Sequence, residues 1–210
     1  MLVLLPGMDG TGTLFEPLLA VLPKTCQIKV INYPTDASLT YEELERYVIE
    51  RLPVGSPLIV IAESFSGPIA LRLAARAHQD LRAVVVVSSF ASRPFGWLGI
   101  LLACLPLGLI LRLPIPDLVL RGLLLGPDAS DEMIRRTRAA IKSVRPNVLA
   151  FRLRQALTSK YCVGPIRCTV PVIALVSTHD RLLGARGHRS IAEACRGAQL
   201  MTIPAPHFAL

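Results

Sequence analysis

The chain has 210 residues, of which 52% are apolar and 18% are charged, and its formal net charge is +8. This length and apolar content predict one globular domain with a full core and exclude a disordered chain. The five cysteines are odd in number and show no Cys-x-x-Cys spacing, so they predict neither a zinc site nor a disulfide framework, and we expect free thiols in a reducing compartment.

Continuous apolar runs alternate with helical patterns along the chain. Uninterrupted apolar runs are typical of parallel strands that are covered on both faces. The predicted strands lie near residues 1–5, 27–32, 57–62, 83–88, 170–176 and 198–203, and the predicted helices of the same region at 40–51, 67–77 and 185–195. This alternation predicts an α/β fold in which helices cover both faces of a mostly parallel sheet of about six strands.

The first predicted strand runs directly into a glycine-rich turn, PGMDGTG, at residues 6–12. Glycines at a strand end either form a flexible turn or let the backbone approach a ligand closely, and the segment alone does not separate these interpretations. The N-terminus has no charged region ahead of its apolar residues, which the strand already uses. No secretory signal is therefore expected, and a cytoplasmic location is the default prediction.

Ser64 follows the third predicted strand in the run AESFSG, residues 62–67, and a helical pattern begins immediately after it. A serine on a sharp strand-to-helix turn has an exposed hydroxyl, and the N–H groups of the new helix face the same space. The small residues Ala62, Ser66 and Gly67 suit so tight a turn. The pattern G-x-S-x-G reads A-x-S-x-S here, so a serine that only caps the next helix is the alternative.

Residues 94–168 form a long insertion between two predicted strands. Residues 94–111 are 18 residues without a charge, which is long enough to raise the question of a membrane span. Pro106, three glycines and the position between two sheet strands argue against one. We expect a helical cap whose inner face lines an apolar pocket, with Trp97 among the residues that contact a bound molecule.

The second half of the insertion is strongly basic. Residues 130–144 predict an amphipathic helix with Ser130 as its cap and a basic outer face. Residues 121–167 hold ten Lys or Arg against three Asp or Glu, which favours an anionic membrane surface or an acidic acyl carrier as partner. A solvated basic face without a partner is the alternative. Aromatic residues are few and none interleaves with these arginines, so nucleic acid is not expected.

An acid and a histidine follow the last two predicted strands. Asp180 comes after the strand at 170–176, and His207 comes after two prolines that end the strand at 198–203. The 27 residues between them leave room for one helix and one strand. A histidine three residues from the last position of the chain is expected to be loosely held. The other histidines are expected to be solvated: His78, His179 and His188.

Serine, then acid, then histidine, each just past a strand, resembles the α/β-hydrolase superfamily. The resemblance covers residues 1–93 and 169–210 as a core, with residues 94–168 as a cap. It implies that Ser64 is the nucleophile, His207 the general base and Asp180 the acid that orients it. It also implies that the backbone N–H groups of Met8 and Phe65 form an oxyanion hole and that Gly7 contacts the substrate. Pro6 stands where the family has a histidine. The strand-to-helix turn at Ser64, which we call the elbow, has alanine and serine in place of two glycines.

This resemblance implies a serine hydrolase that cleaves esters or thioesters of apolar acyl groups through an acyl-enzyme, without a metal or organic cofactor. A lipid-like ester is the expected substrate, and peripheral membrane association is compatible with the basic cap. Two alternatives remain open. An alcohol or thiol in place of water would make the protein an acyltransferase, and the altered elbow and Pro6 are compatible with a non-catalytic binding protein of the same fold.

Overall fold

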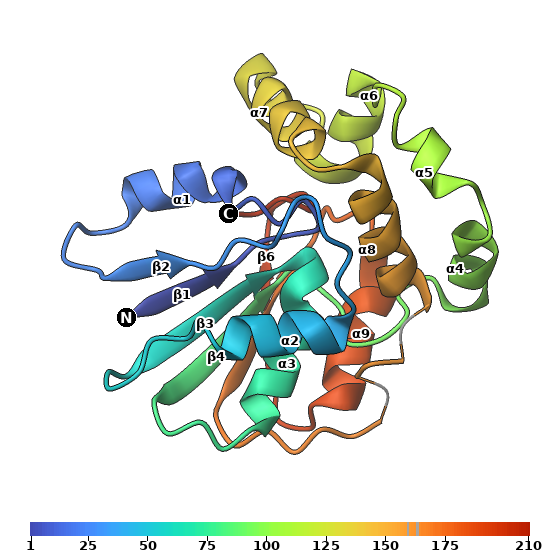
Figure 1. Ribbon diagram of the computed structural model, residues 1–210. Helices are drawn as coiled ribbons and strands as arrows, with labels where there is room; N and C mark the ends of the chain where they lie inside the picture. Colours follow the sequence, from blue (N-terminus) through green and yellow to red (C-terminus); the bar gives the residue numbers. More distant parts are fainter. Residues whose placement is uncertain (159, 163) are drawn as a thin grey trace.

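The computed structural model describes residues 1–158, 160–162 and 164–210. Within these residues, six strands form one parallel sheet in the order β2-β1-β3-β4-β5-β6 (Figure 1). The strands are β1 (Leu2–Leu5), β2 (Ile28–Val30), β3 (Leu58–Glu63), β4 (Leu81–Val87), β5 (Val172–Ser177) and β6 (Gln199–Ile203). The predicted sheet of about six parallel strands is confirmed.

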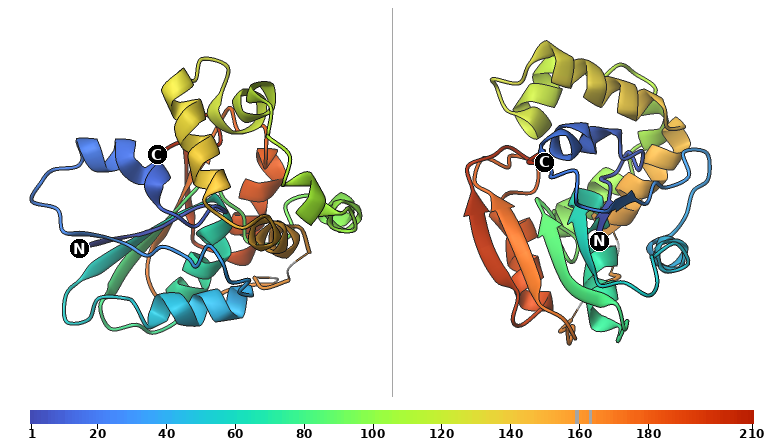
Figure 2. Two further views of the ribbon diagram at one scale, coloured as in Figure 1. Left: turned by 45° about the horizontal axis from the view of Figure 1, so that its top comes forward. Right: turned by 90° about the vertical axis from the view of Figure 1, so that its left-hand side faces the viewer.

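The helices lie between the strands. Those of the sheet region are η1 (Thr13–Phe15), α1 (Glu16–Val21), α2 (Tyr41–Ile49), η2 (Ser64–Ser66), α3 (Gly67–Ala75) and α9 (Gly184–Ala194). Those between β4 and β5 are α4 (Gly96–Ala103), α5 (Leu107–Ile110), α6 (Asp117–Val119), the π-helical turn η3 (Leu120–Leu125), α7 (Asp131–Lys142) and α8 (Pro146–Thr158). Helices α2, α3 and α9 cover one face of the sheet, and α1 lies on the other (Figures 1 and 2).

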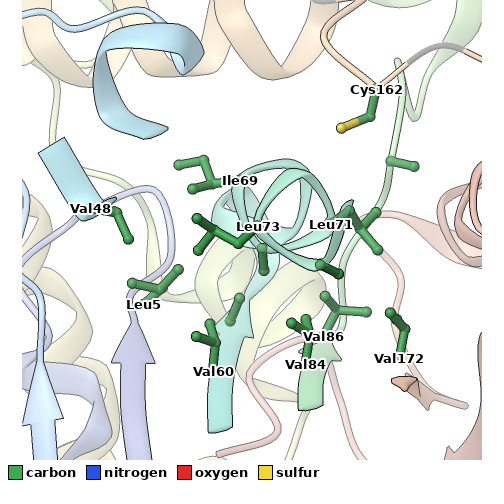
Figure 3. Packing of buried hydrophobic residues seen from close by; sticks show 14 of the residues in the cluster. Leu5, Val48, Val60, Ile69, Leu71, Leu73, Val84, Val86, Cys162 and Val172 are labelled. Atoms are coloured by element: carbon green, nitrogen blue, oxygen red, sulfur yellow. The ribbon is translucent and has the colours of Figure 1, made fainter. Parts of the chain in front are cut away.

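The main core lies between the sheet and helix α3, which is buried over almost its whole length. Leu71 and Leu73 of α3 lie above Val60 and Val84 of the sheet (Figure 3), and all four side chains are at most 2% exposed. Each such side chain contributes roughly 1.5–3 kcal/mol by leaving water. This core fixes the end of β3 and the start of α3, where Ser64 lies.

Helix starts agree with the sequence patterns. Thr40 Oγ1 accepts a hydrogen bond from the Glu43 amide at 3.2 Å, and the Glu43 carboxylate accepts one from the Thr40 amide at 2.8 Å, which makes a capping box at α2. Ser130 likewise caps α7 by accepting from the Met133 amide. The helices predicted at 40–51, 67–77 and 185–195 are seen as α2, α3 and α9, each ending within two residues of the predicted bounds.

Strand β6 differs from the prediction of a buried strand. Its first four residues are exposed, Leu200 and Met201 among them. The physical reason is its place at the edge of the sheet, where only β5 flanks it. The apolar run at 198–203 therefore predicted the strand correctly but not its burial.

The segment between β4 and β5 lies to one side of the sheet (Figure 1). Helix α8 lies next to the core, and α4 and α5 contact α8 from the side that faces away from the sheet (Figures 1 and 2). No helix in the described part of the chain is both long enough and apolar enough to cross a membrane.

Candidate active site

Three side chains from distant parts of the chain meet beyond the strand ends. Ser64 Oγ lies 2.8 Å from His207 Nε2, and His207 Nδ1 lies 2.8 Å from Asp180 Oδ2. Ser64 follows β3, Asp180 follows β5 and His207 follows β6, and parallel strands place their carboxyl ends at one edge of the sheet. The structure thus brings together the serine, acid and histidine that the sequence singled out. An imidazole that contacts both a serine hydroxyl and a carboxylate at these distances can activate the hydroxyl.

His207 is well held, in contrast to the loose histidine expected so near the end of the sequence. Its side chain is 1% exposed, and its neighbour Phe208 donates a backbone hydrogen bond to the Leu124 carbonyl at 2.9 Å. This bond anchors the segment to η3. The segment after β6 therefore holds the imidazole between Ser64 and Asp180.

Asp180 is set up to stay ionised. Burial acts to raise the pKa of its carboxyl, but the hydrogen bond with His207 and those from the Leu182 and Leu183 amides outweigh burial and lower the pKa. The two amides donate to Oδ1 at 2.8 and 2.9 Å, while Oδ2 faces the imidazole. An ionised acid at this position fixes the imidazole tautomer with its proton on Nδ1.

Ser64 has a strained backbone, as the predicted sharp turn between strand and helix requires. Its φ is +48°, in the left-handed region, which costs an ordinary residue about 1–2 kcal/mol. Ser89 Oγ holds this conformation by donating to the Ser64 carbonyl at 2.5 Å. A Cβ on Gly67 would lie 1.8 Å from the same Oγ, so only glycine fits there.

Ser66 stands at the second elbow position where the family pattern has glycine, and its hydroxyl has a structural use. The fully buried Oγ donates to the Pro6 carbonyl and lies 2.6 Å from the hydroxyl of Tyr33. The contact with Pro6 ties the elbow to the glycine-rich turn at residues 6–12. This departure from the family pattern adds a link that glycine cannot make.

The glycine-rich turn lies beside Ser64. A Cβ on Gly7 would lie 4.0 Å from Ser64 Cβ. The Met8 amide donates no hydrogen bond to any group in the described part of the chain, which leaves it available to a ligand. Tyr41 fixes the carbonyl and the ring of Phe65. Its hydroxyl donates to the Phe65 carbonyl at 3.1 Å, and the two rings are stacked. Roles for Gly7, Met8 and Phe65 at the substrate stay predictions.

The family model of the alpha/beta hydrolase family matches residues 2–210. The chain belongs to the alpha/beta hydrolase family. No curated protein sequence matches it.

Solved structures of alpha/beta architecture resemble this family member at low sequence identity. A hydrolase from Oleispira antarctica is 19% identical with a TM-score of 0.74, over 99% of this chain and 84% of that one. A thermophilic esterase from Thermogutta terrifontis is 17% identical with a TM-score of 0.72, over 99% and 82%. The enol-lactonase from Burkholderia xenovorans LB400 is 19% identical with a TM-score of 0.70, over 99% and 84%. At these identities the likeness shows the fold alone.

Arg152 of α8 is a residue of this alpha/beta hydrolase that the sequence did not single out. Its side chain is 1% exposed. Nη1 donates to the carbonyls of Met8 at 2.9 Å and Asp9 at 2.7 Å, and Nη2 donates to that of Pro34 at 2.7 Å. Burial lowers the pKa of the guanidinium. One cation from the segment between β4 and β5 thus holds the turn that contains the predicted oxyanion donor.

A second acid, Glu63, lies beside Ser64. Glu63 precedes Ser64 in the chain and is 4% exposed. Burial first, and then the charge of Asp9, raise the pKa of its carboxyl to about 8. The carboxyl is therefore largely protonated at neutral pH.

Glu63 borders a small and mostly apolar cavity of about 220 Å³. Its walls come from the sheet region and from the segment between β4 and β5. They are formed by Leu14, Glu63, Leu125, Ala129, Ser130, Met133, Phe208 and Leu210. None of the three triad side chains lines the cavity. A Cβ on Gly7 would lie 3.7 Å from Glu63 Oε2 and 4.0 Å from Ser64 Cβ, so the cavity is near the triad through the Glu63 carboxyl.

Two further predictions concern residues away from the triad. Trp97 lies on α4 with 72% of its side chain exposed, and its contact with a substrate stays a prediction. The prediction that His188 is solvated was wrong, because the side chain is 6% exposed on the inner side of α9. Burial lowers the pKa of its imidazole, and neither ring nitrogen has a hydrogen-bond partner in the described part of the chain.

None of the described residues form a group of three or more His, Cys, Asp or Glu that could hold a metal ion.

Proposed function

We propose that the protein is a serine hydrolase that cleaves carboxylic esters or thioesters of apolar acyl groups. The observation that supports it most is the pair of 2.8 Å contacts that link Ser64 Oγ to His207 and His207 to Asp180. The strained φ of Ser64 and the tautomer that Asp180 selects support the same assignment. A serine that only capped α3 would need neither, and Ser64 has no side-chain hydrogen bond to the helix that follows it.

The reaction begins when Ser64 Oγ attacks the carbonyl carbon of the ester and passes its proton to His207 Nε2. Asp180 stabilises the imidazolium that results. The backbone N–H groups of Met8 and Phe65 stabilise the oxyanion of the tetrahedral intermediate, by about 3 kcal/mol for each donor. His207 then gives its proton to the leaving alcohol or thiol, and the acyl group stays on Ser64. Water activated by the same histidine releases the acid.

The apolar acyl group would lie in the 220 Å³ cavity beside the triad. Leu14, Leu125 and Met133 supply apolar walls, which favour a hydrocarbon chain over a polar or charged group. The protonated Glu63 carboxyl presents no charge to that chain at neutral pH. This arrangement favours acyl chains of several carbons over acetate.

A fluorophosphonate probe, which labels activated serines, tests the proposal directly. We expect labelling of the wild-type protein, loss of labelling in Ser64→Ala, and full labelling in Ser38→Ala, which changes an exposed serine. A folded wild-type protein that is not labelled would contradict the proposal and favour the non-catalytic alternative.

A p-nitrophenyl ester series from acetate to octanoate tests the acyl preference. We expect kcat/KM to rise with chain length, and a clear preference for acetate would contradict the assignment of the cavity. Adding an alcohol acceptor to the same assay separates a hydrolase from an acyltransferase, because only the latter diverts most of the acyl group to the alcohol.

A further inference from the structure

Large apolar side chains concentrate on the outer surface of α4, α5 and α6. In the described part of the chain, sixteen large apolar side chains are exposed, and ten of them lie within residues 97–119. Single exposed leucines are ordinary, but a contiguous apolar patch marks a contact with a partner or a membrane. We call this surface the outer cap face; its most exposed members are Trp97, Leu101, Leu109, Leu113 and Leu118.

The sequence of the outer cap face is not that of a surface in contact with water. Helix α4, GWLGILLA, is apolar on every side, whereas a helix with one buried face carries polar residues on the other. It contacts α8 through Gly99, where a Cβ would lie 2.8 Å from the Leu157 carbonyl. Trp97, Leu98 and Leu101 point elsewhere and are exposed, and Figures 1 and 2 show α4 and α5 at the outer edge of the molecule.

Cations border an apolar groove next to this face. The groove has a volume of about 440 Å³, and its apolar walls include Leu113 and Ile115. Arg112, Arg138 and Lys142 line it as well. Arg138 is paired with Asp117, whereas Arg112 and Lys142 have no acidic partner among the described residues. An apolar groove with unpaired cations matches a molecule that has both an anionic group and hydrocarbon.

The net charge of residues 94–168 helps to decide which partner binds the outer cap face. Residues 94–168 hold eleven Lys or Arg against four Asp or Glu. A second copy of the chain docked through the same face would bring the unpaired Arg112 and Lys142 of the two copies toward each other, which opposes association. An acidic protein would match the charge but not a face whose residues 97–119 include only two charged side chains, Arg112 and Asp117. A bilayer that contains anionic lipid matches both.

We infer that the outer cap face docks on an anionic phospholipid bilayer, with α4–α6 at the boundary of headgroups and acyl chains and with Arg112 and Lys142 on lipid phosphates. Interfacial segments of this kind combine buried apolar area with attraction between basic residues and anionic lipid. The inference does not depend on the proposed hydrolysis. It adds a reason why an enzyme for apolar esters would meet its substrate at a membrane.

Trp97 is the only tryptophan of the chain and lies on the proposed docking face, so its fluorescence reports the event directly. The test uses the Ser64→Ala protein, in which no turnover interferes, with vesicles of phosphatidylcholine alone or mixed with phosphatidylglycerol. With the mixed vesicles we expect co-sedimentation, a blue shift of the Trp97 emission and quenching by lipids brominated on their acyl chains. Binding should weaken as salt is added, because salt screens the attraction.

Variants that change the apolar residues and the basic residues separately make the test more specific. Leu109→Glu combined with Leu113→Glu should abolish binding. Val54→Glu, which changes an even more exposed residue in the loop between α2 and β3, should not. Arg112→Ala combined with Lys142→Ala should weaken binding to the anionic vesicles at least tenfold. Lys24→Ala combined with Lys29→Ala removes the same charge from exposed positions away from the cap and should leave binding unchanged.

Three results would overturn the inference. One is Trp97 emission that the mixed vesicles do not change in a protein with an intact circular dichroism spectrum. Another is equal vesicle binding by the Leu109 and Leu113 double variant and by Val54→Glu. The third is a dimer, detected by light scattering without lipid, that the same double variant dissociates, since this would assign the face to a second copy. Because binding is measured in Ser64→Ala, none of these results bears on the proposed hydrolysis.

Discussion

Arg152 and Gly10 fit against each other, although one comes from α8 and the other from the turn after β1. A Cβ on Gly10 would lie 2.5 Å from Arg152 Nη1, and the φ of Gly10 is +73°. Position 10 therefore needs glycine for two reasons: its backbone conformation is left-handed, and the guanidinium occupies the space that a Cβ would need. The conformation of the turn that contains Met8 depends on a cation supplied by the segment between β4 and β5.

Replacing Arg152 should impair catalysis more than substrate binding. In Arg152→Met the carbonyls of Met8 and Asp9 lose their donor, so the Met8 amide is no longer fixed toward the oxyanion. We expect kcat for a p-nitrophenyl ester to fall by roughly 10²-fold, as for loss of one oxyanion donor, with a small change in KM. Arg152→Lys, which keeps one donor, should recover part of the loss.

Arg154→Met is the matched control. Arg154 lies on the same helix two residues later, is exposed, and donates only to the carbonyls of Ala103 and Leu105. It should leave kcat near the wild-type value. A folded Arg152→Met protein with unchanged kcat would show that the turn keeps its conformation without the guanidinium.

Gly67→Ala should destabilise the protein and distort the elbow. The new methyl would meet Ser89 Oγ at 1.8 Å and Ser89 Cβ at 2.8 Å, and overpacking of this kind typically costs about 1–3 kcal/mol. Urea unfolding measures the loss. Adding Ser89→Gly removes both contacts and should restore part of the stability, whereas equal losses in the single and double variants would mean that the clash lies elsewhere.

Local patterns in the sequence predicted the strands of the sheet and the three residues of the triad. The strands are short apolar runs. Ser64 directly follows one of them, and Asp180 and His207 follow theirs within four residues, so parallel pairing brings all three to the same edge of the sheet. The burial of His188 was also encoded locally. Ile191 of α9 and Cys195, the residue just after α9, follow it by three and seven residues and are buried as well. Helical spacing places His188 on the buried face of α9, although an imidazole is polar.

The contacts of Arg152 and Ser66 could not be predicted in the same way. Arg152 is separated by 144 residues from Met8, and Ser66 by 60 residues from Pro6. No periodicity connects such positions, because the partners are backbone carbonyls that any residue carries. Arg152 does interrupt an apolar stretch of α8, which is the only trace of its role in the sequence. Its three acceptors follow from tertiary structure alone.

Asp180→Asn should slow catalysis strongly without removing the labelled serine. The amide can present its NH₂ to His207 and favour the wrong imidazole tautomer, and the corresponding change in a serine-protease triad lowers kcat by about 10⁴-fold. We expect a loss of that order in ester hydrolysis, with slow residual fluorophosphonate labelling. Loss below tenfold would mean that another group orients His207.

The same variant has a predicted effect on stability at low pH. The pKa of Asp180 is lowered in the folded protein, so the ionised carboxylate stabilises the fold above its ordinary pKa of 3.8, and this contribution is lost as the pH falls through the lower folded value. The free energy of unfolding of Asp180→Asn should therefore lie below that of the wild type at pH 6, and the difference should shrink toward pH 2. A difference independent of pH would contradict this assignment.

Glu63→Gln should stabilise the protein at neutral and alkaline pH. The ordinary pKa of a glutamate is 4.5, and burial raises that of Glu63 to about 8. Between these values the unfolded chain releases a proton that the folded chain keeps, so the wild type loses stability as the pH rises through this window. Glutamine has the same shape and does not titrate.

The two proteins should therefore differ little in free energy of unfolding at pH 4, and the variant should gain progressively up to about pH 8. At roughly 1.4 kcal/mol for each unit of pKa difference, the gain should level off at a few kcal/mol above that pH. Urea unfolding at unit steps from pH 4 to pH 9 measures it. Glu42→Gln, at an exposed position of α2, is the control and should run parallel to the wild type. A Glu63→Gln curve that also runs parallel would mean that Glu63 is ionised in the folded protein, and the cavity beside Ser64 would then carry a negative charge.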